Sequence, residues 1–265
     1  MTQTREERRE TRTARCRLWL EMSLVAALTA GCGLSPIDHR IKLGEEPFVI
    51  FVGEGSDHNT DLFTATTTGG HVYQLTFTRV IEVAPALANG GGMAAFLRIR
   101  DTLPDTPRDV VIMNLENGAE KTIPLPAIAG LPRSLGWAPG DQLVYIRADH
   151  GLWQARVPPS GGPATAVPDA DSRVAIQATG AWLGQPPFAE AIPCPTGICI
   201  VGPRHDTTSL SSTGHHPMRW GRDSVAWFEG QEMIVRSLGA GRPRRVVLKD
   251  APANAREGSM GGTGT

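Results

Sequence analysis

Two cysteines, Cys194 and Cys199, have a spacing that could support chemistry. The residues between them include Pro195 and Gly197, which suit a hairpin loop that brings two sulfur atoms within bonding distance. In an oxidising compartment the default product is a disulfide. Because it would close a very small loop, we expect local order more than global stability. A redox couple or a metal site is less favoured, since a redox pair has the spacing Cys-x-x-Cys.

Two polar clusters could hold a metal ion. Residues 56–61 alternate acidic and amide side chains as a calcium loop does, but Leu62 stands where such a loop needs Gly, and no Glu follows at the required distance. The loop more simply caps a hairpin, with Asp61 starting the next strand. His205, His215 and His216 could bind zinc, but their spacing specifies no ligand geometry. We therefore expect no metal and no cofactor.

Nucleophilic catalysis has little support in the sequence. No Gly-x-Ser-x-Gly elbow is present, and Gly53-Glu54-Gly55 lacks the third Gly and the helix of a dinucleotide site. We assign no catalytic residue.

The N-terminus is predicted to be a targeting signal. Residues 1–17 carry six Arg, and residues 18–31 form a short apolar core that ends in small residues. This order is typical of a secretory signal. The core is too short for a membrane-spanning helix, which needs about 20 apolar residues, and Glu21 interrupts it.

The end of this core, Leu28-Thr29-Ala30-Gly31-Cys32, resembles a bacterial lipoprotein signal. It departs from that pattern at Thr29, where Leu is usual. The resemblance implies cleavage after residue 31 and a lipid on Cys32, with an ordinary signal or an uncleaved anchor as alternatives. Gly33, in place of Asp, resembles sorting to the outer membrane. We expect a periplasm-facing protein anchored in the cell envelope, with the outer membrane favoured.

Charge limits the partners of the mature chain. Removing residues 1–31 takes six Arg and four Glu from totals of 26 basic and 27 acidic residues, which leaves a net charge of −3. A slightly acidic protein has no general attraction to nucleic acid or to anionic lipid. We expect no nucleic acid partner, and membrane contact through the lipid anchor only.

The rest of the chain contains repeats. Thirty Gly and 21 Pro favour a turn-rich β fold. Residues 133–167 hold four short apolar runs separated by turns, which predicts a four-stranded antiparallel meander. Such a sheet cannot bury both faces alone and needs copies beside it. Clear copies occupy residues 37–77, 81–125 and 216–248, and a degenerate one occupies 169–213.

The repeats also lead to two expectations about the ends of the domain. In the first copy we place the first strand at Arg40 to Leu43, after a short linker at 32–36. Residues 249–265 are expected to form a disordered tail, because we count no apolar run in them.

The repeats resemble those of TolB-like β-propellers. Trp137-Ala138-Pro139-Gly140-Asp141 before an apolar strand matches the first half of that repeat. The stretch Asp61-Leu62-Phe63-Thr64-Ala65, followed by Gly69-Gly70, matches the second half. The resemblance covers 37–248 and implies an all-β propeller of four-stranded antiparallel blades, with about five blades and six as the alternative. An open stack or a β-sandwich is the other fold that the repeats allow.

The resemblance is stronger evidence for fold than for function, because propellers host many activities. It implies partners among envelope proteins, and a small ligand is equally compatible. We expect a non-catalytic module that binds or scaffolds them. The alternative is an extracytoplasmic hydrolase or lyase with its site at the central channel, which would require carboxylates or imidazoles from several blades to converge.

Overall fold

The computed structural model describes most of the chain after the predicted signal. The described residues are 37, 40–43, 45–55, 58–101, 103, 106–157, 162–180, 190–202, 204–220, 224–230, 232–238 and 242–261. The predicted signal peptide and the lipid-attachment residue Cys32 lie outside them and stay predictions. In the described part, no helix is both long and apolar enough to cross a membrane.

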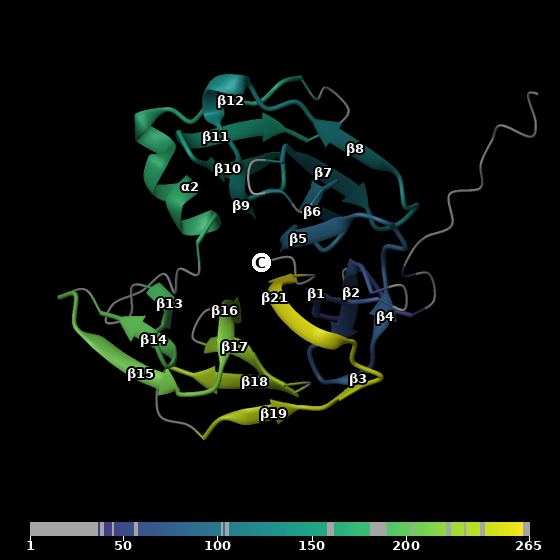
Figure 1. Cartoon of the computed structure of the whole chain (residues 1–265), viewed down its shortest axis with the longest axis vertical. Coiled ribbons are helices and arrows are strands. Elements are labelled where there is room, and N and C mark those ends of the chain that lie inside the picture. Colours follow the sequence, from purple (N-terminus) through teal and green to yellow (C-terminus); the bar gives the residue numbers. More distant parts are fainter. Residues whose placement is uncertain are drawn as a thin grey trace, which may run out of the picture. The chain divides into compact units, whose positions relative to one another are not determined.

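Five antiparallel sheets, here called blades 1 to 5, follow one another along the chain (Figure 1). Blade 2 has the strand order β5-β6-β7-β8, blade 3 the order β9-β10-β11-β12, and blade 5 the order β16-β17-β18-β19. The bounds are β5 Ile81–Leu87, β6 Met93–Ile99, β7 Arg108–Asn114, β8 Glu120–Ile123, β9 Pro132–Trp137, β10 Leu143–Ala148, β11 Gly151–Arg156, β12 Thr165–Ala166, β16 His215–Trp220, β17 Ser224–Glu229, β18 Glu232–Ser237 and β19 Arg244–Val246.

Blades 1 and 4 depart from this pattern. Blade 1 has the order β21-β1-β2-β4, so its first strand comes from the end of the chain. Blade 4 has three strands among the described residues, in the order β13-β14-β15. The bounds are β1 Phe48–Glu54, β2 Thr60–Thr66, β4 Tyr73–Gln74, β21 Ala253–Gly261, β13 Glu190–Cys194, β14 Gly197–Val201 and β15 Thr207–Ser211.

The remaining elements are short. β3 (Gly70–His71) and β20 (Leu248–Lys249) form a parallel pair between blades 1 and 5. The 3₁₀ helix η1 (Ala127–Ala129) precedes blade 3. The 3₁₀ helix η2 (Asp169–Asp171) leads into α2 (Ser172–Ala178), which contacts β9, β10 and β11.

The central strands of blade 1 are apolar on both faces because this blade is packed between blade 2 and blade 5. In β1, Val49 and Phe51 face the core shared with blade 5, whereas Phe48, Ile50 and Val52 face the core shared with blade 2. Successive side chains of a strand point to opposite faces, so this run needs apolar residues at every position. The innermost strands also contact one another: β21 with β5, β5 with β9, β13 with β16, and β16 with β21.

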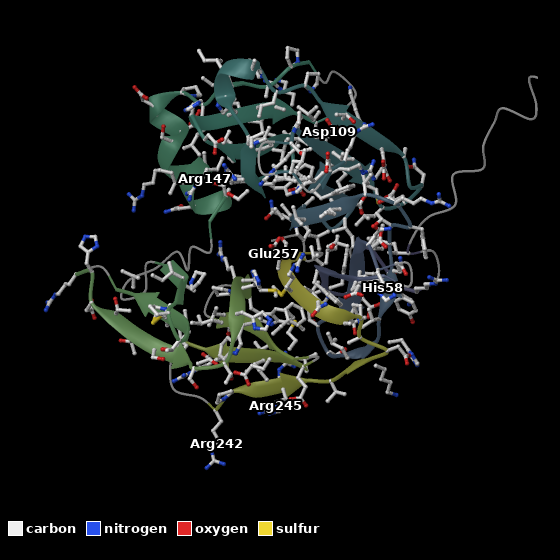
Figure 2. The ribbon with its side chains drawn as sticks, viewed as in Figure 1. His58, Asp109, Arg147, Arg242, Arg245 and Glu257 are labelled. Carbon is white, nitrogen blue, oxygen red and sulfur yellow. A yellow bond between two sulfur atoms is a disulfide. The ribbon has the colours of Figure 1, made fainter. Side chains whose placement is uncertain are left out.

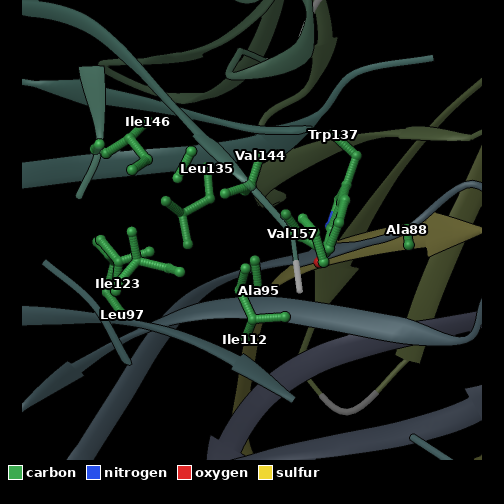
Figure 3. Packing of buried hydrophobic residues seen from close by; sticks show 14 residues of the cluster. Ala88, Ala95, Leu97, Ile112, Ile123, Leu135, Trp137, Val144, Ile146 and Val157 are labelled. Carbon is green, nitrogen blue, oxygen red and sulfur yellow. The ribbon is translucent and has the colours of Figure 1, made fainter. Parts of the chain in front are cut away.

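The core between blades 2 and 3 explains the residues of the turn motif Trp137 to Asp141. Trp137 lies among apolar side chains of both blades (Figure 3), and its Nε1 donates to the carbonyl of Ala86 at 2.9 Å. The carboxylate of Asp141 accepts hydrogen bonds from the backbone N–H groups of Asn89 and Gly90, at 2.8 and 2.7 Å. Both motif residues therefore join one blade to the next.

The two expectations about the chain ends are wrong. Residues 253–261 are not disordered: β21 pairs with β1, and Ala255 is buried. Arg40 to Leu43 form turns and bends instead of a strand. One cause accounts for both errors, since the C-terminal strand occupies the place that we had given to Arg40 to Leu43.

Candidate functional site

The innermost strands of all five blades surround a cavity of about 700 Å³, here called the axial cavity. Its walls come from β5, β9, β13, β16 and β21, together with the last turn of α2. Most of the lining is apolar or small, as in Leu135, Met218 and Gly258. Charged or titratable side chains at the wall are Arg133, His216, Arg219 and Glu257. A cavity of this size, with both apolar and polar side chains in its wall, fits a small ligand.

Besides the register shift at Arg133 in β9, three neighbouring inner strands carry a β-bulge at this cavity. The pairing register shifts between Val83 and Ala86 in β5, between His215 and Met218 in β16, and opposite Phe51 and Val52 in β21. A bulge inserts one extra residue and re-aims the side chains around it, and bulges are frequent beside functional sites.

Each bulge contains a residue other than glycine with a left-handed backbone. The φ angles are +52° at Ala84, +51° at His216 and +41° at Glu257. A residue with a Cβ held in this region costs about 1–3 kcal/mol and persists only where its surroundings impose it. All three residues line the axial cavity. Because three strained residues lie together here, this part of the cavity is the candidate functional site.

Direct contacts join the three bulges. Glu257 Oε2 accepts a hydrogen bond from the Ala84 backbone N–H at 2.8 Å, and His216 Nδ1 lies 3.9 Å from Glu257 Oε1. Two residues along β21, Ser259 Oγ accepts from the Leu87 N–H at 2.9 Å. Figure 2 shows Glu257 on β21, with Arg242 and Arg245 pointing outward from blade 5. The C-terminal strand thus presents polar side chains to blade 2 and to the cavity.

Burial controls the protonation of His216. Loss of solvent around the ring lowers the pKa of His216, and nearby His215 and Arg256 lower it further, while the Glu257 carboxylate raises it. The net direction is downward, so at neutral pH the ring is neutral. A neutral imidazole can donate and accept hydrogen bonds, but it does not cancel the charge of Glu257.

The two arginines of the wall are placed differently. Arg133 Nε donates to Asp149 Oδ1 at 2.6 Å, and this guanidinium, with the Leu131 N–H, lowers the pKa of Asp149. The positive charge of Arg133 is therefore balanced within blade 3. Arg219 follows His216 by three residues, toward the other end of β16.

Other sequence-predicted candidates have structural roles. A disulfide joins Cys194 and Cys199 across the turn between β13 and β14, with Cα atoms 5.7 Å apart, as predicted. Asp61 is buried, and its carboxylate accepts hydrogen bonds from Gln74, Thr76 and the N–H of Thr78. It orders the corner of blade 1. The first two residues of the suspected calcium loop, Ser56 and Asp57, lie outside the described residues.

The imidazoles considered as zinc ligands are divided by the fold. His215 and His216 begin β16, whereas His205 lies in the turn before β15. In the part of the chain that the structure describes, no group of three or more His, Cys, Asp and Glu side chains could hold a metal ion.

The sequence analysis missed Glu257, because it treated the tail as disordered. One signal could have located the inner strands. Pro85, Pro193 and Pro217 all line the axial cavity, and Pro132 starts β9. Proline has no N–H to donate and is confined to edge positions of a sheet, such as a strand that borders a channel.

The comparisons with known proteins bear on the fold. No protein-family model matches the chain, and no curated protein matches it. A chain in the crystal structure of a nidogen/laminin complex is similar, with a TM-score of 0.52 and 7% identity over 83% of this chain and 99% of that chain. The fold is a β-propeller.

A second similar structure is TolB from Acinetobacter baumannii, with a TM-score of 0.39 and 11% identity. The match covers 80% of the present chain and 66% of the TolB chain, slightly less than two thirds of it.

Proposed function

We propose that this protein is a lipid-anchored, extracytoplasmic β-propeller that binds an envelope protein or a small ligand and does not catalyse a reaction. The axial cavity carries this proposal: it holds about 700 Å³ and is walled by all five inner strands. Concave sites of about 300–1,000 Å³ are typical of binding sites for small ligands. Envelope partners are favoured by the resemblance of the repeats to TolB-like propellers.

The proposed location rests on two observations. A disulfide is expected to persist only in an oxidising compartment, so the Cys194–Cys199 bond supports an extracytoplasmic site. The buried Ile37 follows the predicted lipidated Cys32 by five residues. A chain of that length spans at most about 18 Å, so a lipid on Cys32 would hold the propeller against the membrane.

Mass spectrometry of the protein from its native membrane tests the location. We expect an N-terminal acylated Cys32 and a mass two protons lower than that of the reduced chain. The outer membrane fraction should contain it. A full-length chain with free thiols in the cytoplasm would overturn both the anchor and the compartment.

The binding role is tested by filling the cavity. Gln177→Trp places a large side chain in the wall contributed by α2, and Thr122→Trp places the same side chain on the exposed face of β8 as a matched control. Partners cross-linked to the wild-type propeller in the envelope should be lost from the first variant and kept by the second. If both variants keep the same partners, the axial cavity is not the binding site.

One observation favours the enzymatic alternative as a second candidate. His216 and Glu257 come from different blades and meet at 3.9 Å, and a neutral imidazole beside a carboxylate is a common general base. A propeller hydrolase would cleave activated esters or lactones, and His216→Ala would abolish that turnover. Hydrolysis that persists in His216→Ala, or none in the wild type, would exclude this pair as its base.

A further inference from the structure

We propose that Glu257 is the recognition residue of the axial cavity and that it binds the ammonium group of a small primary amine, beside the ring of His216. The inference rests on the proposed binding role of the cavity and adds the chemical class of the ligand. It is carried by the geometry of the three bulges around one carboxylate.

The first argument is the state of the two carboxylate oxygens. Oε2 accepts the N–H of Ala84 at 2.8 Å, which fixes the orientation of the side chain. Oε1 lies 3.9 Å from His216 Nδ1, beyond hydrogen-bond distance. Among the described residues no other donor bonds to Oε1, so this oxygen is oriented and open to a ligand that donates hydrogen bonds.

The second argument is the charge around that oxygen. Glu257 is the one carboxylate in the described wall of the axial cavity. Arg133 is paired with Asp149, and Arg219 lies nearer the other end of β16. Arg256 neighbours Glu257 on β21 but is not part of the wall. Because His216 is neutral, no cation among the described residues of the wall is bound to this carboxylate, and a ligand cation would supply one.

The third argument is the strained backbone. Left-handed conformations at Ala84, His216 and Glu257 occur at the same level of three adjacent strands. Without the bulges, the Ala84 N–H would not face β21, and His216 and Glu257 would keep the regular alternation of their strands. The strain therefore assembles one anchored carboxylate and one imidazole at a single point of the cavity.

The walls define the rest of the ligand. The side chains of Ala84, Pro85, Ile192, Pro193 and Met218 offer apolar contacts in the same wall. An ammonium group with a short alkyl chain matches one anionic point on an apolar wall.

Calorimetric titration of the full chain, purified with its lipid in detergent, tests the inference with three probes of equal length: butylamine, butanol and butyrate. We expect saturable binding of butylamine, at least about tenfold tighter than that of butanol, and no binding of butyrate. Glu257→Gln keeps an oxygen for the Ala84 N–H but removes the charge, and should weaken butylamine binding about tenfold or more. Glu116→Gln, on an exposed turn, should leave it unchanged.

The outcomes separate this inference from the proposed function. Equal affinities for butylamine and butanol, or wild-type affinity in Glu257→Gln, would overturn ammonium recognition. Displacement of butylamine by stoichiometric zinc would also overturn it, in favour of a metal at the same pair. If butylamine does not bind but Gln177→Trp still loses partners, the cavity binds another class of ligand. Circular dichroism of Glu257→Gln must match the wild type for these outcomes to apply.

Discussion

The propeller is held together very differently on its two sides. On the closure side, where β21 completes blade 1 beside blade 5, the core contains Phe51, Phe63 and Phe228, with ring centroids 6.1 and 5.3 Å from Phe51. On the helix side, the described residues that pack α2 onto blade 3 are smaller, centred on Ala175 against Ala138 and Tyr145.

Chain connectivity explains this difference. At the closure side the two ends of the domain meet without a covalent link, so packing must offset the entropy of closing a loop of some two hundred residues. At the helix side the chain runs continuously from blade 3 to blade 4, and a modest contact suffices. The contrast predicts that mutations on the closure side act on the whole fold and those on the helix side act locally.

The largest effect on stability is expected from the removal of β21. Deleting residues 253–265 exposes one edge of β1, together with Val49 and Phe51 from the core. We expect loss of cooperative thermal unfolding, because the closure of the ring is removed. A synthetic peptide of residues 250–261 should restore it when added in excess. A truncated chain that unfolds at the wild-type temperature would show that β21 does not close the fold.

A single side chain should give the next largest effect. Phe51→Ala removes a fully buried ring from the closure side and should lower the free energy of unfolding by about 3–5 kcal/mol. The matched variant on the helix side is Leu152→Ala, where the side chain is only partly buried, and the expected loss is about 1 kcal/mol. Urea unfolding measures both. Equal losses would mean that the two sides contribute alike.

Much of this architecture could be predicted from sequence, because repeats have a period and a turn chemistry. The turn at Trp137 to Asp141 contains Gly140 and Asp141, which take the left-handed angles +82° and +55° that such turns need. The strand β21 could not be predicted in the same way. It has many small and polar residues, and its place depends on pairing with β1, some two hundred residues away, which no local pattern encodes.

The candidate site was less predictable for the same reason. His216 is visible in the sequence, but its partner Glu257 and the donor Ala84 come from other blades. A bulge is also set by the pairing register rather than by residue type, and none of the three has glycine at its left-handed position.

The disulfide of blade 4 allows a test of whether this blade is coupled to the rest of the ring. Replacing Cys194 and Cys199 by Ala removes a cross-link between residues only five apart. The entropy of so small a loop predicts a loss of at most about 2 kcal/mol. Hydrogen exchange should quicken in β13 to β15 while β1 and β17 keep their protection. Faster exchange on the closure side would mean that blade 4 is coupled to the whole ring.

The smallest expected effect is the pH dependence of stability that comes from His216, in blade 5 on the closure side. Because burial lowers the pKa of His216 below its ordinary 6.5, the unfolded chain binds this proton more readily than the folded chain. Stability from this residue should therefore rise with pH between the lowered pKa and 6.5. Below the lowered pKa of His216, the ring is protonated in both the folded and the unfolded chain, so its destabilising effect on the fold no longer changes with pH. The unfolding temperature of His216→Ala should change less between about pH 5 and pH 8 than that of the wild type. If His216→Ala shows the full wild-type slope, the ring is solvated in the folded protein, and the neutral imidazole beside Glu257 must be abandoned.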